Sequence, residues 1–114
     1  MDDCIFCKIA EKEIKSNIVY EDENIIAFDD ISPQAPVHVV IITKKHVKSV
    51  DFLREEDKAM AAEIILSFGK IARIKKIEKE GYRIVSNHLE SAGQSVFHLH
   101  FHLLGGRKMD WPPG

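Results

Sequence analysis

The chain has 114 residues, of which 45% are hydrophobic and 30% are charged, and its formal net charge at pH 7 is −2. A chain of this length buries a core of its own, so we expect one domain over residues 1–114. The near-balanced charge argues against nucleic acid or an anionic membrane as a partner, because both are usually bound by an excess of basic residues.

The N-terminal residues MDDCIFCK are acidic where a signal peptide is basic. The chain also has no apolar run approaching the roughly 20 residues that cross a bilayer as a helix. We therefore expect a cytoplasmic protein in a reducing compartment, with no membrane partner.

Cys4 and Cys7 are the only cysteines, and their spacing allows a disulfide, a redox dithiol or half of a zinc site. A reducing compartment disfavours the disulfide, and a redox pair normally follows a strand. A tetrahedral zinc site needs two further ligands, for which six histidines are available. The zinc half-site is the interpretation that the residues favour.

Three apolar residues at helical spacing predict a short helix over residues 4–12. Residues 18–21 and 25–30 are predicted to form two short strands, joined by an acidic turn at residues 22–24. Two prolines exclude a regular element over residues 29–36, so this segment should be a rigid loop that presents polar groups at a strand end.

The β-branched run over residues 38–43 is typical of a central strand. An amphipathic pattern with acidic residues at its start and lysines at its end predicts one long helix over residues 54–79, which Gly81 ends. Residues 82–87 alternate as a strand. The apolar stripe of the long helix should cover the sheet, because the chain has no other long helix.

Residues 97–106, FHLHFHLLGG, predict a strand that carries His98, His100 and His102 on one face and bulky apolar residues on the other. A core strand is one interpretation, although three unpaired imidazoles are costly to bury. A three-histidine metal site is a second, but the outer two histidines of a flat strand lie roughly 13 Å apart. We favour a third, in which one histidine is a nucleophile and its neighbours position the substrate, the leaving group or a structural metal.

The loop before this strand is rich in small and polar residues, Ser91, Ala92, Gly93, Gln94 and Ser95. Such residues allow close approach of the backbone and offer amide and hydroxyl donors to a phosphate. A plain tight turn is the alternative. The position of the loop directly before three histidines favours a phosphate site. His88, at the start of the loop, has no role that we can assign, and we expect it to be exposed.

Residues 98–104, HLHFHLL, match the His-apolar-His-apolar-His-apolar-apolar motif of the histidine-triad superfamily of nucleotide hydrolases and transferases. The segments CIFCKI, FDDISPQAPVH, GQSVFHLHFHLLGGR and WPPG resemble the Hint branch, the histidine triad nucleotide-binding proteins and purine nucleoside phosphoramidases, in its bacterial type with an N-terminal cysteine pair. The resemblance spans nearly the whole chain. It implies an α+β, HIT-like fold with an antiparallel five-stranded sheet, one long helix and a short N-terminal helix.

The resemblance implies a two-step nucleotidyl transfer. His100 would attack the α-phosphorus of a purine nucleoside 5′-phosphoramidate or related conjugate, and water would hydrolyse the covalent nucleotidyl-histidine to the nucleoside monophosphate. A neutral imidazole can attack without prior deprotonation. His102 would lie against the leaving group or phosphate oxygens, Ser95 would help to protonate or orient the leaving amine, and His38 would support the nucleophile from the neighbouring strand.

The same resemblance implies how the nucleotide binds. Asp30 would accept hydrogen bonds from the ribose hydroxyls. An apolar slot for the purine would be formed by Ile31, Phe28, Phe6 and Ile9, although core packing is the alternative for the last three. The phosphate would be contacted by Asn87, Gly93, Gln94 and Ser95, together with His100 and His102.

Relatives with the cysteine pair imply a structural zinc ion held by Cys4, Cys7, His46 and His98, one per subunit and closed to water. No organic cofactor is implied. The branch also implies a homodimer, in which the tail over residues 105–114, with the single tryptophan, shapes leaving-group selectivity at the partner's active site. A dinucleoside polyphosphate hydrolase and a non-catalytic nucleotide-binding or scaffold protein are the alternative functions.

Overall fold

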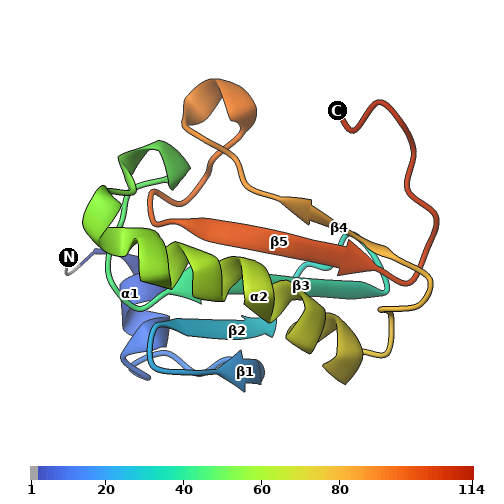
Figure 1. Cartoon of the computed structure of the whole chain (residues 1–114), viewed down its shortest axis with the longest axis horizontal. Helices are drawn as coiled ribbons and strands as arrows, with labels where there is room; N and C mark the ends of the chain where they lie inside the picture. Colours follow the sequence, from blue (N-terminus) through green and yellow to red (C-terminus); the bar gives the residue numbers. More distant parts are fainter. Residues whose placement is uncertain (1–2) are drawn as a thin grey trace.

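The computed structural model describes residues 3–114, and its five strands form one antiparallel sheet in the order β1-β2-β3-β5-β4 (Figure 1). The strands are β1 (Ile18–Glu21), β2 (Ile25–Asp29), β3 (Val37–Thr43), β4 (Tyr82–Val85) and β5 (His100–Gly105). The α-helices are α1 (Ile5–Ala10) and α2 (Lys58–Ile74). Short 3₁₀ turns are η1 (Val50–Phe52), η2 (Glu55–Asp57) and η3 (Glu90–Ala92). The α+β fold, with one long helix and a short N-terminal one, is confirmed.

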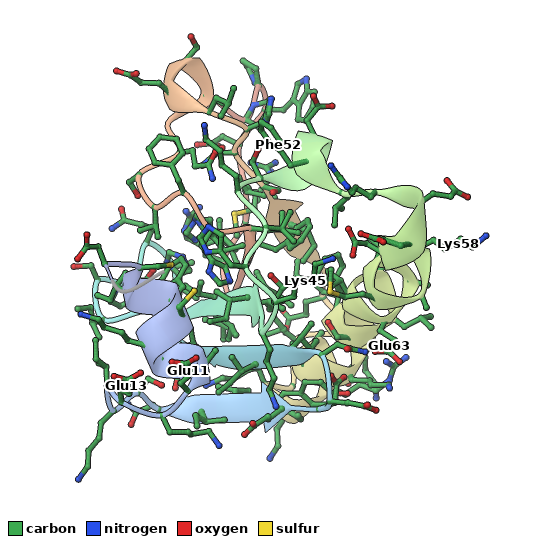
Figure 2. All side chains as sticks on the ribbon, turned by 90° about the vertical axis from the view of Figure 1, so that its left-hand side faces the viewer. Glu11, Glu13, Lys45, Phe52, Lys58 and Glu63 are labelled. Carbon is green, nitrogen blue, oxygen red and sulfur yellow. The ribbon has the colours of Figure 1, made fainter. Side chains whose placement is uncertain are left out.

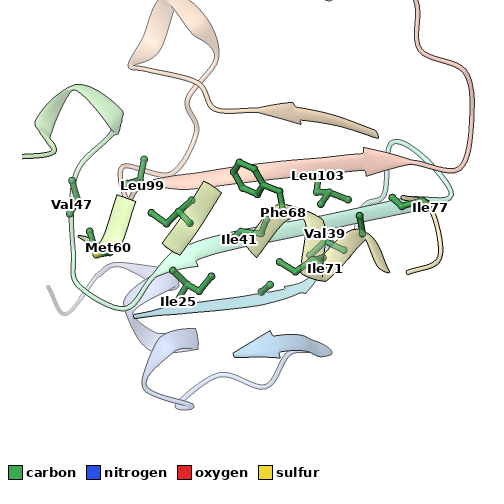
Figure 3. Close-up of a cluster of buried hydrophobic side chains, with 13 residues drawn as sticks. Ile25, Val39, Ile41, Val47, Met60, Phe68, Ile71, Ile77, Leu99 and Leu103 are labelled. Carbon is green, nitrogen blue, oxygen red and sulfur yellow. The ribbon is translucent and has the colours of Figure 1, made fainter. Parts of the chain in front are cut away.

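One face of the sheet forms the main core against α2. Side chains alternate along each strand, so Val39, Ile41 and Leu103 all point to this face. The apolar stripe of α2 lies over them through Ile64 and Ile71, and the whole cluster is buried (Figure 3). The predicted use of the helical stripe as core is therefore confirmed.

The opposite face carries α1 and the catalytic candidates. Phe6 and Ile9 of α1 pack on Phe28 and Val40 in a second, smaller buried cluster. The register pairs Val40 with His102 and Ile42 with His100, and residues directly opposite in a ladder share a face. The imidazoles of β5 therefore lie beside the short N-terminal helix, on the side of the sheet away from α2.

Two element boundaries differ from the prediction. The long helix begins at Lys58 rather than at residue 54, because the buried carboxylate of Asp57 accepts a hydrogen bond from the Arg54 amide and ends a separate 3₁₀ turn. It ends after Ile74, and Lys76 has a φ of 61°, which breaks the helical path. Within residues 3–114, no helix has the length and apolar character needed to cross a membrane.

The final strand is also shorter than predicted: it begins at His100 and not at Phe97. The ladder with β4 ends at the pair Val85 and His102, so β4 also stops before Asn87. Leu99 instead donates its amide hydrogen to the carbonyl of Val47, 2.6 Å away. This contact takes the backbone out of the ladder just where the His98 side chain turns toward α1.

Candidate active site and metal cluster

All the histidines except His88 fall into two neighbouring groups. His98 and His100 are 0% and 5% exposed, His38 of β3 is buried, and His102 is half-buried. Figure 2 shows side-chain nitrogen atoms gathered next to α1, and Cys7, whose sulfur belongs to one of the groups, is part of that helix. One group consists of His98 with His46 and the two cysteines, and the other of His100, His102, His38 and Asp30.

His100 is held with a defined nitrogen available for chemistry. Its Nδ1 lies 2.7 Å from the carbonyl oxygen of His98, and since a carbonyl only accepts, Nδ1 carries the hydrogen. The Nε2 atom therefore keeps its lone pair. Burial lowers the pKa of His100, so the ring stays neutral near pH 7. The edge-on ring of Phe6, 5.0 Å away between centroids, fixes the imidazole plane.

His38 and His102 form a directed hydrogen-bond pair. The Gln34 amide donates to His38 Nδ1 over 3.0 Å, so in neutral His38 the proton is on Nε2. That Nε2–H faces His102 Nδ1 at 2.9 Å, with the Asp30 carboxylate 3.4 Å away. Burial lowers the pKa of His102 to about 4. His102 is therefore neutral, accepts at Nδ1 and carries its hydrogen on Nε2, where it can be donated.

The ligand atoms of Cys4, Cys7, His46 and His98 all lie within 4.8 Å of one another. Individual separations are 3.2 Å from Cys4 Sγ to His98 Nδ1, 3.3 Å from Cys7 Sγ to His46 Nδ1 and 3.2 Å between the two Nδ1 atoms. A tetrahedral zinc ion, with Zn–S near 2.3 Å and Zn–N near 2.0 Å, spaces its ligands about 3.3–3.8 Å apart. The four side chains therefore fit such an ion closely.

The protonation of this cluster also suits a cation. His98 donates Nε2–H to the Thr43 carbonyl over 2.7 Å. Its Nδ1 atom therefore keeps a lone pair, and that atom faces the cysteines. Burial lowers the pKa of His98 to about 4, so it is neutral. Burial and the neighbouring Cys4 raise the pKa of the Cys7 thiol to about 11, and a bound divalent cation would reverse that by favouring the thiolate.

A second possible ligand group, Asp30, His38 and His102, is chemically different although its atoms also lie within 4.8 Å of one another. Two histidines and a carboxylate can hold a divalent cation. Here, however, the Gln34 amide keeps the lone pair of His38 on Nδ1 and the hydrogen on the Nε2 that faces the group. The backbone therefore favours a directed hydrogen-bond pair at this group and a metal at the other.

The predicted nucleotide contacts lie around the second group. The Asp30 carboxylate is half-buried and accepts from the Ser32 amide over 2.7 Å. Phe6, Ile9 and Phe28 are packed together in the small buried cluster, as core packing predicts. Ile31, by contrast, is 99% exposed and is available to cover a ligand.

The loop between β4 and β5 contains the candidate phosphate contacts. Asn87 is half-buried, whereas Gly93, in a left-handed conformation with φ of 91°, and Ser95 are exposed. Gln94 is buried and differs from the prediction. Its side-chain amide donates to the carbonyls of Lys48 and Val96, its Oε1 accepts from the Leu89 amide, and its own backbone amide donates to the Leu89 carbonyl. This geometry assigns Gln94 to holding the loop rather than to touching a phosphate.

His88 was expected to be exposed, and that expectation is wrong. The ring is half-buried, with Nδ1 2.7 Å from the hydroxyl of the buried Ser49 and the ring plane against Phe52. His88 thus ties the loop to η1. Its neighbour Leu89 has a φ of 66° and a ψ of −174°, a conformation that normally requires glycine. Neither feature has a sequence pattern that would have revealed it.

Comparison with known proteins identifies the family of the chain. The sequence model of the HIT domain matches residues 11–109. An uncharacterized HIT-like protein of Synechococcus elongatus is 44% identical over 113 residues, which cover 99% of this chain and 98% of that protein.

Solved structures agree as well. The crystal structure of a HIT family hydrolase from Legionella pneumophila has a TM-score of 0.95 and 47% identity, over 98% of this chain and 100% of that one. A hypothetical histidine triad nucleotide-binding protein from Sulfolobus tokodaii has a TM-score of 0.78 and 32% identity, over 94% of this chain and 71% of that one. The chain therefore belongs to the HIT domain family.

Proposed function

We propose that this chain is a nucleotide-binding hydrolase of the Hint branch that cleaves purine nucleoside 5′-phosphoramidates and related conjugates. One observation carries the proposal: the His98 carbonyl holds His100 Nδ1–H at 2.7 Å, which leaves an unprotonated Nε2 in a buried, neutral ring. Two similar proteins, a HIT family hydrolase and a hypothetical histidine triad nucleotide-binding protein, support the same reaction class.

In the first step, His100 Nε2 forms a bond to the α-phosphorus while the phosphorus–nitrogen bond to the leaving amine breaks. The departing nitrogen takes up one proton from solvent, and His102 Nε2–H or the Ser95 hydroxyl would hold and orient it through a hydrogen bond. His102 stays neutral throughout this step, and the hydrogen bond from His38 Nε2–H, 2.9 Å away, orients its ring. The product of this step is a nucleotidyl-histidine and a free amine.

In the second step, water attacks the same phosphorus and the bond to His100 breaks, which regenerates the neutral ring and releases the nucleoside monophosphate. The attacking water releases its proton to solvent, which balances the proton that the leaving amine took up in the first step. Splitting the displacement into two steps lets the buried imidazole replace water as the first nucleophile.

Substrate binding follows the residues around this group. Asp30 would accept from the ribose hydroxyls with the carboxylate face that the Ser32 amide leaves open. The exposed Ile31 side chain would cover one side of the purine, with Phe6, Ile9 and Phe28 behind it. Asn87, Gly93 and Ser95 would line the phosphate site from the loop before β5. A cytoplasmic location stays a prediction from the sequence.

A structural zinc ion is part of the same proposal. Cys4, Cys7, His46 and His98 would hold it, with all four positions taken and none left for a reacting water. The ion would supply cross-linking alone. It would tie α1 and the segment after β3 to His98, which lies two residues before β5.

A homodimer is the proposed assembly. The outer face of α2 exposes large apolar side chains, with Ile65 60%, Leu66 66% and Ile74 51% exposed, and β4 is an edge strand. Trp111 of the tail is 82% exposed. A partner that covers α2, β4 and the tail would bury these groups, and the tail over residues 105–114 would then shape leaving-group selectivity.

Release of AMP from an adenosine 5′-phosphoramidate tests the reaction. The wild type should turn the substrate over, and His100→Ala should not, with an unchanged circular dichroism spectrum as the control for folding. Preference for a dinucleoside polyphosphate would instead favour the alternative hydrolase. Binding of AMP without turnover of either substrate would favour the non-catalytic alternative, and full turnover by His100→Ala would contradict the mechanism.

A further inference from the structure

The chain directly after β5 packs against the loop that carries Asp30. Gly106 has a φ of 85°, and a Cβ placed on it would lie 2.9 Å from Pro36 Cβ and 3.5 Å from the Val37 amide nitrogen. Such an approach leaves no room for a side chain at this position. The end of the catalytic strand is therefore in close contact with the loop over residues 30–36.

Arg107 fastens this contact. Its Nη2 and Nε donate to the carbonyl oxygen of Gln34 over 3.0 Å and 3.4 Å, and its Nη1 donates to the carbonyl of Lys108 over 3.1 Å. A planar guanidinium that donates twice to one carbonyl fixes both the position and the direction of that peptide group. The Gln34 carbonyl is thereby held from outside the active site.

The same residue faces inward with its amide. Gln34 N–H donates to His38 Nδ1 over 3.0 Å, and the Gln34 side chain closes the loop by donating to the Ser32 carbonyl over 3.0 Å. If the Gln34 amide turned away, His38 could place its hydrogen on Nδ1. Its Nε2 would then present a lone pair to the Nδ1 lone pair of His102, and the 2.9 Å contact would become repulsive.

The geometry points to Arg107 as a positioning residue: through the carbonyl and the amide of Gln34 it keeps the hydrogen of His38 on Nε2, so that His102 keeps its own hydrogen on Nε2 for the leaving group. This inference rests on the proposed reaction for its catalytic consequence. Arg107 itself is exposed and touches neither substrate nor reacting atoms.

The test compares three variants. Arg107→Met removes the guanidinium and roughly keeps the length of the side chain. Arg107→Lys keeps the positive charge but has a single ammonium group in place of the two neighbouring donors. Lys15→Met is the matched control, because it removes the same charge from an exposed position outside the tail and the candidate site. The two readouts are the protonated nitrogens of His38 and His102, from long-range proton–nitrogen NMR correlations, and kcat and KM for AMP release.

Arg107→Met should show hydrogen on Nδ1 in a fraction of His38 and a kcat lowered about threefold to tenfold, the factor expected for losing one hydrogen bond. Arg107→Lys should recover part of both effects, and Lys15→Met should match the wild type. An unchanged His38 tautomer in Arg107→Met would overturn the inference. If the wild type releases no AMP, the proposed reaction fails, whereas the NMR readout still decides the role of Arg107.

Discussion

Backbone groups give chemically identical histidines different roles. His98 donates Nε2–H to the Thr43 carbonyl, whereas His100 donates Nδ1–H to the His98 carbonyl. His38, in contrast, accepts at Nδ1 from the Gln34 amide. Each contact decides which ring nitrogen keeps a lone pair. The consequence is one ring suited to a metal, one to nucleophilic attack and one to orienting a donor.

The buried histidines also predict how the stability of the metal-free protein depends on pH. Burial lowers the pKa of both His98 and His102 from 6.5 to about 4. As the pH falls below 6.5 the unfolded chain binds protons that the folded chain does not, so the free energy of unfolding decreases until the pH approaches 4. The loss should be on the order of 1 kcal/mol per pH unit for each histidine.

Urea unfolding in the presence of a chelator, at pH values from 8 to 5, checks this prediction. The chelator removes the separate pH dependence that metal binding would add. We expect a nearly constant free energy of unfolding above pH 7 and a steady decrease below 6.5. A constant value down to pH 5 would show that the histidines are accessible to protons in the folded state.

At the scale of elements, the loop before β5 is tied to the segment that follows β3. Leu99 donates its amide hydrogen to the Val47 carbonyl over 2.6 Å, Gln94 donates to the Lys48 carbonyl over 2.7 Å, and His88 bonds the Ser49 hydroxyl. These ties run between residues that are about forty to fifty positions apart in the chain. The candidate phosphate site is thus held by a segment outside the sheet.

Gln94→Met tests this arrangement. The substitution keeps the volume but removes both donors and the acceptor, so buried backbone groups lose their partners and stability should fall by about 1–3 kcal/mol. Turnover should fall as well, because Ser95 follows directly. Ser91→Ala, an exposed change in the same loop, is the control and should alter neither urea midpoint nor kcat. A Gln94→Met protein with wild-type stability would contradict the assigned role.

The metal cluster links α1 to the rest of the molecule. Protein purified with zinc should contain one ion per chain by mass spectrometry under native conditions, and Cys7→Ser should lose it because the cluster then lacks a thiolate. Chelation should lower the melting temperature of the wild type but not of Cys7→Ser. His88→Asn, which removes a histidine outside the cluster, should keep the ion. Zinc retained by Cys7→Ser would exclude the proposed ligand set.

The elements differ in how far the sequence predicts them. The bounds of β1 and the start of β2 follow from their alternation and the acidic turn, as predicted. The start of α2 and that of β5 do not, because they depend on the buried carboxylate of Asp57 and on the Leu99 contact to Val47. The same limit applies to the site. Histidines and cysteines can be found by their spacing, whereas backbone partners such as Thr43 and Gln34 have no pattern of their own.

At the scale of the whole molecule, the exposed apolar face of α2 predicts a dimer. A charged side chain introduced on that face should dissociate it. Leu66→Glu places a carboxylate in the middle of that face and should give a monomer by analytical ultracentrifugation at micromolar concentration, with the fold intact. Glu13→Lys is the control, since Glu13 lies beside α1, away from α2 (Figure 2), and should leave the dimer unchanged. A monomeric wild type would remove the proposed assembly.

The central step of the proposed mechanism is a covalent bond between substrate phosphorus and His100. Wild-type protein mixed with adenosine 5′-phosphoramidate, quenched in alkaline denaturant during turnover and digested, should contain an adenylyl group on the peptide with His100, mapped by mass spectrometry. The adduct should decay as AMP appears and should be absent from His100→Ala. Release of AMP without an adduct, or an adduct on another residue, would contradict the proposed mechanism.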